Sequence, residues 1–291
     1  MEDLLRPIYQ ERASHANTLG VLLLEKIKPE NPATDNFDVV LLVITKQNDN
    51  DKNALVKHYQ LENGKIAALK IADTNQLENW INLGTNRRVI DWVLNGKVLF
   101  ERNEYITELK QTIHDFPLNN RKKRIGLEFA KLIRRFIDGK ELFESGNLLD
   151  AYNNMVHALH HLARLSVIDH GFHPEVTVWN QVRKIEPEVY KLYQELIESR
   201  ESLKKRLDLL FLASEFLVHS STKVGSLHLL EVMNHNEVWT IQELVTHPEL
   251  TDYSIDFEAL VEYLIEKKLI KVITEETKGL NIYHRKYSSH I

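Results

Sequence analysis

The sequence predicts an α+β domain with a small mixed sheet, then an all-α helical bundle, then a winged helix-turn-helix, over residues 1–117, 118–219 and 220–291. In the first region short strand signals alternate with short helix signals, which is typical of an α+β domain. In the second region strand signals vanish and apolar residues recur at helical spacing. In the third region helices precede two strands, which is the order of elements in a winged helix.

Short apolar runs predict the strands of the first region. Val21–Lys26 and Asp38–Thr45 are short enough to be buried strands. Val56–Ala72 contains Asn63-Gly64 at its centre and therefore predicts a β-hairpin. Gly96–Arg102 predicts a further strand.

Cap residues predict two helices in the same region. Asp73 and Thr74 precede a helical segment, and Asn103 precedes another that runs toward His114. In the bundle, residues 188–218 are long enough for one long helix or for two in sequence. Near the C-terminus, Lys278-Gly279 predicts the turn between two strands.

Composition limits the classes of protein. The chain has 291 residues, of which 43% are apolar and 27% charged, as in ordinary globular proteins. It has no cysteine, which excludes disulfides and cysteine-based metal sites and favours a cytoplasmic location. No apolar run approaches the roughly 20 residues that span a membrane. The net charge of −5 argues against indiscriminate binding of nucleic acid.

An acidic turn precedes the second predicted strand. Asp35, Asn36 and Asp38 lie directly before the apolar run Val39–Ile44. If the strand extends back through the turn, Asn36 and Asp38 share one face, and Asp35 joins them only where the chain bends. Asp38 is therefore either a metal ligand at the sheet edge or a strand-opening residue hydrogen-bonded in the turn.

These residues resemble a known family. A strand that carries Gly20, followed by an acidic turn and a second strand at Asp38, resembles the polymerase-β type of nucleotidyltransferase. The whole chain is similar to a Firmicutes family called nucleotidyltransferase-like, which has a helical bundle and a C-terminal winged helix. The bundle also resembles the substrate-binding or HEPN-like domain of such proteins. The resemblance implies a catalytic Asp38, a phosphate contact at Gly20, and Mg²⁺ held by Asp35, Asn36 and Asp38.

The chain departs from that pattern in three places. Val21 rather than serine follows Gly20, Asn36 replaces a carboxylate, and the segment 65–72 carries no acid. Because two-metal chemistry needs several carboxylates, we expect at most weak binding of Mg²⁺ and impaired nucleotidyl transfer.

Basic residues in both regions are candidates for phosphate binding. Guanidinium groups suit bidentate phosphate contact, and the candidates are Arg87, Arg88, Arg102 and Arg124, together with Lys131. Arg124 and Lys131 belong to a basic stripe at the start of the bundle, which Glu128 interrupts. We expect a nucleoside triphosphate or a nucleic-acid-related ligand between the first two domains. The alternative is that these cations are solvated or paired with acids.

A histidine-rich segment follows in the bundle. At helical spacing one face carries His157, His160, His161 and Arg164. This face predicts contact with a substrate or a partner, or it is simply exposed to solvent.

The winged helix is acidic. From Ser220 onward there are seven Lys and Arg against eleven Asp and Glu, a local net charge of 7 − 11 = −4. A groove-reading helix needs cations near the phosphates, so packing on the bundle or binding of protein is favoured over binding of DNA. The alternative function is therefore a non-enzymatic regulatory or interaction protein that uses the winged helix for a protein or DNA partner. A homodimer is one option for its assembly.

Overall fold

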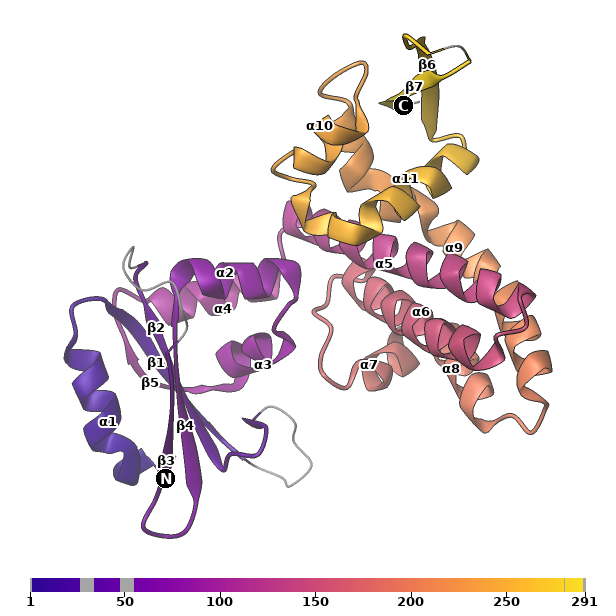
Figure 1. The fold of residues 1–291 in the computed structure, drawn as a ribbon. Coiled ribbons are helices and arrows are strands. Elements are labelled where there is room, and N and C mark those ends of the chain that lie inside the picture. Colours follow the sequence, from indigo (N-terminus) through magenta and orange to yellow (C-terminus); the bar gives the residue numbers. More distant parts are fainter. Residues whose placement is uncertain (1, 27–33, 48–54, 280, 290–291) are drawn as a thin grey trace. The chain divides into compact units, whose positions relative to one another are not determined.

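The computed structural model describes residues 2–26, 34–47, 55–279 and 281–289 (Figure 1). The chain forms two compact units. The N-terminal unit consists of Met1–Pro117 and His173–Val176, and the helical unit consists of Leu118–Phe172 and Thr177–Ile291.

A five-stranded mixed sheet forms the centre of the N-terminal unit. Its strands are β1 (Thr18–Glu25), β2 (Val39–Thr45), β3 (Leu55–Gln60), β4 (Ile66–Asp73) and β5 (Lys97–Glu101). The strand order is β3-β4-β2-β1-β5. Among the described strands of this sheet, β2 and β4 pair in parallel and the other neighbours are antiparallel. The predicted α+β domain with a small mixed sheet is confirmed.

Both faces of the sheet are covered by helices. In β2, Val40, Leu42 and Ile44 face one core and the alternate residues face the other, as the period-two geometry of a strand requires. Figure 1 shows α1 (Glu2–Ser14) on one side of the sheet. The helices α2 (Thr74–Leu83), α3 (Arg87–Asn95) and α4 (Tyr105–Asp115) lie on the other. Burial on both faces explains the continuous apolar run of β2.

The two predicted caps have different outcomes. The Asp73 side chain accepts a hydrogen bond from the backbone N–H of Gln76 at 2.8 Å, and Gln76 bonds back, so α2 begins with a capping box. The prediction of a cap at Asn103 was wrong. Glu104 holds the cap position of α4 without a side-chain cap bond. Both residues have positive φ, 51° and 58°, so the chain turns before the helix begins.

Five helices of the described chain build the centre of the helical unit. They are α5 (Leu118–Glu144), α6 (Leu148–Asp169), α7 (Val178–Ile185), α8 (Pro187–Glu198) and α9 (Leu203–Met233). Of the two options for residues 188–218, the structure has two helices, because the chain leaves helical geometry at Ser199 and Ser202 caps α9. The predicted helical bundle is confirmed.

The C-terminal region continues from α9 without a break. It comprises α10 (Ile241–Thr246), the 3₁₀ helix η2 (Thr251–Asp256), α11 (Phe257–Glu266) and the hairpin of β6 (Ile270–Glu276) and β7 (Tyr283–Ser289). Trp239 forms a single bridge to Tyr287. This is the predicted order of helices followed by a two-stranded wing. Because α9 runs through the predicted boundary at residues 219 and 220, the bundle and the winged helix share one helix.

Close packing joins the winged helix to the bundle. The Tyr253 hydroxyl lies so near Gly126 of α5 that a Cβ there would be 2.1 Å away. Tyr253 also hydrogen-bonds His228 of α9 at 3.0 Å, and Tyr263 of α11 hydrogen-bonds Thr222 of α9 at 2.8 Å. The described C-terminal region is therefore part of the helical unit.

Candidate functional site

The acidic turn before β2 is bent, not extended. Residues 34–36 form a turn, and Asp35 has a φ of 54°. The strand begins only at Val39, so the period-two relation expected between Asn36 and Asp38 does not apply. The backbone bend separates the environment of Asp35 from that of Asp38.

Asp38 is bound to the neighbouring strand. Its Oδ2 accepts a hydrogen bond from the backbone N–H of Ile66 at 2.9 Å. Its own N–H donates to the Ile66 carbonyl at 3.0 Å, and its carbonyl accepts from Lys26 at 2.8 Å. Asp38 therefore joins the first residues of the parallel pair β2 and β4 to the end of β1. These contacts are those of a strand-opening residue.

Asp35 forms the anionic centre of a small charged cluster. Its Oδ1 lies 2.6 Å from a guanidinium nitrogen of Arg88, and its Oδ2 lies 3.6 Å from Nζ of Lys70. Lys70 also lies over the ring of Trp92, 4.5 Å from the centroid. Arg88 and Trp92 belong to α3 and Lys70 to β4, so packing of that helix on the sheet assembles the cluster. Two cations thus hold one carboxylate at a partly exposed edge.

The carboxylates of this edge do not fit a two-metal site. The Asp35 carboxylate is engaged by two cations and one Asp38 oxygen by a backbone N–H. Within the described residues no group of three or more His, Asp or Glu has metal-binding geometry. Two divalent ions need several carboxylates to bridge them and offset their charge. The described donors are therefore too few, and the Asp35 carboxylate is already paired with two cations.

Gly20 and Arg102 lie at the other end of the sheet. Gly20 pairs with Ile44 and Glu101, whereas Glu25 at the far end of β1 pairs with Val39. A Cβ on Gly20 would meet Ile106 at 2.4 Å, so α4 packs directly against this glycine. The structure does not bring Gly20 to the acidic turn. The C-terminal end of β1, at Glu25, lies beside that turn.

Arg102 binds backbone carbonyls at this second edge. Its Nε donates to the Thr18 carbonyl at 3.0 Å, and a terminal nitrogen donates to the His15 carbonyl at 3.4 Å. Arg102 therefore fixes the connection between α1 and β1. Arg87 is the first residue of α3, directly before Arg88.

A polar seam lies between α5 and α6 of the helical unit. His161 Nδ1 lies 2.7 Å from Oε2 of Glu128, and a terminal nitrogen of Arg164 lies 3.4 Å from the same oxygen. All three side chains are at most 14% exposed. Nearer the other end of α5, Arg135 donates to the side-chain oxygen of Asn154 at 3.2 Å. The structure thus joins His161 and Arg164 to Glu128, the glutamate that interrupts the basic stripe.

The seam perturbs two titratable groups. Burial by itself would raise the pKa of Glu128, but the hydrogen bond with His161 and the charge of Arg164 lower it to about 2. Burial, followed by the charge of Arg135, lowers the pKa of His157. Glu128 is therefore charged and His157 neutral at pH 7. Lys131 adds a positive charge beside Glu128.

His160 points into a different environment. Its ring packs edge-on against Trp179 and Tyr193, which are themselves stacked with centroids 4.0 Å apart. Trp179 donates its indole N–H toward His160 Nε2 at 3.4 Å. His160 therefore joins α6 to α7 and α8, and it does not share the seam.

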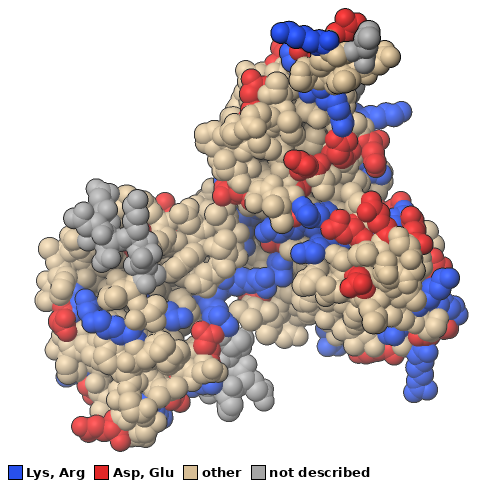
Figure 2. Space-filling model, in the orientation of Figure 1, with Lys and Arg blue, Asp and Glu red and all other residues tan. Residues whose placement is uncertain are grey.

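The basic start of α5 is paired with the winged helix. Lys122 lies 2.5 Å from Glu231 of α9, and Lys123 lies 2.6 Å from Asp252 of η2. Arg124 is buried, with 5% of its surface exposed. Figure 2 shows blue Lys and Arg side chains beside red acidic ones over this unit. The expected packing of the winged helix on the bundle supplies partners for these cations.

Sequence reasoning missed Trp92 and Glu128 as members of a site. It offered Lys70, a cation inside a buried strand, as a neighbour of Asp38, whereas the structure pairs Lys70 with Asp35. Glu128 interrupts a basic stripe, and that pattern is the signal that could have indicated a partner nearby. Nothing in the local pattern around Trp92 indicates its contact with Lys70.

The fold and these sites place the chain in a family. Residues 1–121 match the family described as nucleotidyltransferase-like, residues 122–221 the YgxA-like substrate binding domain, and residues 227–289 a helix-turn-helix domain. The chain belongs to the nucleotidyltransferase-like family with a YgxA-like substrate binding domain and a C-terminal helix-turn-helix. The predicted resemblance is confirmed.

Two relatives cover nearly the whole chain. The protein named "Uncharacterized protein YgxA" of Bacillus subtilis (strain 168) is 56% identical over 288 residues, which is 99% of this chain and 97% of that protein. The crystal structure of a nucleotidyltransferase-like protein from Exiguobacterium sibiricum 255-15 has a TM-score of 0.83 at 42% identity, and all of each chain is covered. Among the described residues, no helix has the length and apolar character needed to cross a membrane.

Proposed function

We propose that the N-terminal unit binds the phosphate groups of a nucleotide-type ligand at Lys70 and Arg88, and that its metal-dependent nucleotidyl transfer is impaired. The observation that carries this proposal is the Asp35 carboxylate, which lies 2.6 Å from Arg88 and 3.6 Å from Lys70. A phosphate oxygen prefers the same two partners, since guanidinium groups bind phosphate and carboxylate alike. Asp35 then competes with the ligand for the two cations.

The match to a YgxA-like substrate binding domain supports a second binding surface, for a substrate, in the helical unit. In the seam between α5 and α6, the cations Lys131, Arg135 and Arg164 outnumber the single carboxylate of Glu128. Such a surface favours an anionic or hydrogen-bonding substrate over a cationic one. The nucleotide and the substrate are thus assigned to separate units of the chain.

Calorimetric titration of the full-length protein with ATP tests the nucleotide proposal. Arg88→Gln is expected to weaken binding about tenfold, because it removes a charge-assisted contact. Asp35→Asn is expected to tighten binding in the absence of Mg²⁺, because the competing carboxylate loses its charge. Arg6→Gln on α1 removes one exposed guanidinium and serves as the matched control.

Three outcomes contradict this proposal. Absence of saturable binding at millimolar ATP rules out the site. Weaker binding of Asp35→Asn only when Mg²⁺ is present identifies Asp35 as a metal ligand. Robust release of pyrophosphate that is lost in Asp38→Ala likewise contradicts impaired transfer.

An interaction protein is the second candidate function, and the exposed surface of α11 favours it. Glu258, Glu262 and Glu266 recur at four-residue spacing, and all three are exposed. Arg285 of the wing is bound by Glu262 through two contacts, at 2.9 and 3.1 Å. A helix that reads a DNA groove needs cations near the phosphates, so this acidic surface favours a protein partner.

We expect the full-length protein to bind duplex DNA no tighter than about 1 µM at physiological salt, which is the tight end of the range for non-specific binding. The triple variant Glu258→Lys, Glu262→Lys, Glu266→Lys is expected to bind at least about tenfold more tightly, since it places three cations on α11. Gel-shift titration with mixed-sequence duplexes measures both affinities. Sub-micromolar binding of the wild type, weakened by the triple variant, contradicts the prediction.

A further inference from the structure

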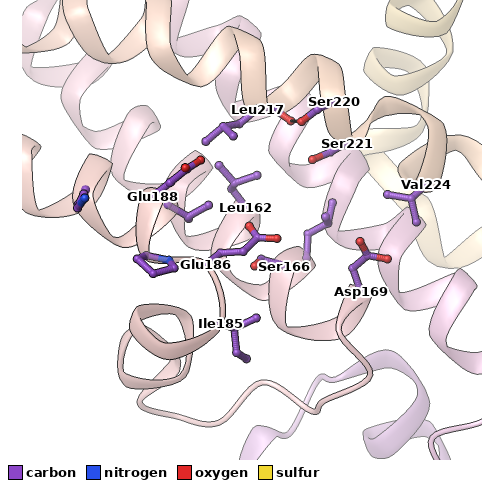
Figure 3. Close-up of a pocket in the computed structure, with 14 residues that line it drawn as sticks. Leu162, Ser166, Asp169, Ile185, Glu186, Glu188, Leu217, Ser220, Ser221 and Val224 are labelled. Carbon is purple, nitrogen blue, oxygen red and sulfur yellow. Dashed lines mark hydrogen bonds between the residues drawn. The ribbon is translucent and has the colours of Figure 1, made fainter.

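A cavity of about 590 Å³ lies in the helical unit, between α6, the start of α8 and α9 (Figure 3). Its volume falls in the range of small-molecule sites. Figure 3 shows side chains from three elements around it: Leu162, Ser166 and Asp169 from α6, Glu186 and Glu188 around the start of α8, and Leu217, Ser220, Ser221 and Val224 from α9. The cavity therefore combines apolar walls with a small number of polar groups.

The charged groups of the cavity are mostly acidic. Asp169, Glu186 and Glu188 line it together with one lysine, Lys191. Glu186 has a neighbouring partner, since His170 Nδ1 lies 3.8 Å from its Oε1. Among the described residues, neither Asp169 nor Glu188 has an ion-pair partner. The cavity thus favours a positively charged ligand.

Helix stability explains only part of this acidity. Glu188 lies in the first turn of α8, where the helix dipole favours a carboxylate. Asp169 is the last residue of α6, where the same dipole disfavours one. Asp169 is exposed and has no ion-pair partner among the described residues, so its carboxylate is accessible to a ligand.

Ser166 lines the same cavity, and its hydroxyl is unsatisfied. The residue is 2% exposed, and its Oγ has no hydrogen-bond partner among the described residues. A buried hydroxyl without a partner costs free energy, which a donor on a ligand recovers. The hydroxyl can accept such a bond, as the carboxylates can.

We propose that this cavity binds an aliphatic organic cation that carries primary ammonium groups, of the polyamine class. The carboxylates of Asp169 and Glu188 bind the ammonium groups, Ser166 accepts a further N–H, and the methylene chain packs on Leu162 and Leu217. This site is separate from the proposed nucleotide site, because all of its residues belong to the helical unit. Either proposal can fail without the other.

Calorimetric titration of the full-length protein with spermidine, at about 150 mM NaCl to screen surface charge, tests the site. We expect one saturable site, with affinity lowered at least about tenfold in the double variant Asp169→Asn, Glu188→Gln. Asp208→Asn removes an exposed carboxylate of α9 outside the cavity and is expected to leave the affinity unchanged. The neutral probe 1,8-octanediol, of similar length, is expected not to bind.

Ser166→Ala separates binding from packing. It is expected to lower spermidine affinity while leaving the thermal midpoint of the free protein unchanged or higher, since it removes an unsatisfied hydroxyl. A lower midpoint of free Ser166→Ala with unchanged affinity overturns the role of this residue in binding. No saturable binding of spermidine, or equal loss in Asp208→Asn and the double variant, overturns the site.

Discussion

Replacing Glu128 by glutamine is expected to lower the free energy of unfolding by about 3 kcal/mol at pH 7, because it leaves Arg164 partly buried without its counterion. Glutamine keeps the size of the side chain, so the loss reports the charge and not a cavity. Urea unfolding of the full-length protein, followed by circular dichroism, measures the change. Glu144→Gln, an exposed position at the end of the same helix, is the matched control, with an expected change within about 0.5 kcal/mol.

The pH dependence of this difference tests the electrostatic explanation. The pKa of Glu128 is lowered from 4.5 to about 2 in the folded protein. A lowered pKa means that the unfolded chain binds the proton more tightly, so acid favours unfolding. The stabilisation is therefore complete above about pH 4.5 and is lost as the pH falls toward 2. A difference between wild type and Glu128→Gln that stays constant from pH 7 to pH 3 contradicts this explanation.

Gly225→Ala is expected to destabilise the helical unit by about 1–3 kcal/mol through overpacking. A Cβ at this position of α9 would lie 2.2–2.6 Å from ring atoms of Phe129, which is fully buried in α5. Alanine is the better helix former by about 1 kcal/mol, so a net loss of stability requires that the clash exceed this gain.

Gly139→Ala is the matched control for this clash. Gly139 also lies within a helix, but its added Cβ would meet Asn154 at 3.2 Å and Phe211 no closer than 3.4 Å. We expect this variant to be close to the wild type in stability, or slightly above it. Thermal unfolding of both variants compares them directly. If Gly225→Ala unfolds at the same temperature as Gly139→Ala or higher, α5 and α9 do not pack as closely as described.

Much of the fold follows from local patterns in the sequence. The buried strand at Val39–Thr45, the hairpin at Asn63-Gly64 and the capping box at Asp73 each depend on residues close together in the chain. Apolar spacing likewise predicts the long helices of the bundle. Asn103 failed as a cap because the backbone at this turn takes a left-handed conformation, which its side chain alone does not determine.

The sites depend on contacts that local patterns do not contain. The sequence by itself determined which carboxylates stand before β2 and that the segment 65–72 carries no acid. Only the tertiary structure decided that Asp38 binds the backbone of β4, and that Asp35 binds Arg88 and Lys70. In the same way, the sequence shows Glu128 only as an interruption of a basic stripe. The tertiary structure places His161 and Arg164 of α6 beside it. The physical reason is that a charge is satisfied by whichever groups packing brings within a few ångströms, and these residues lie on different elements of the chain.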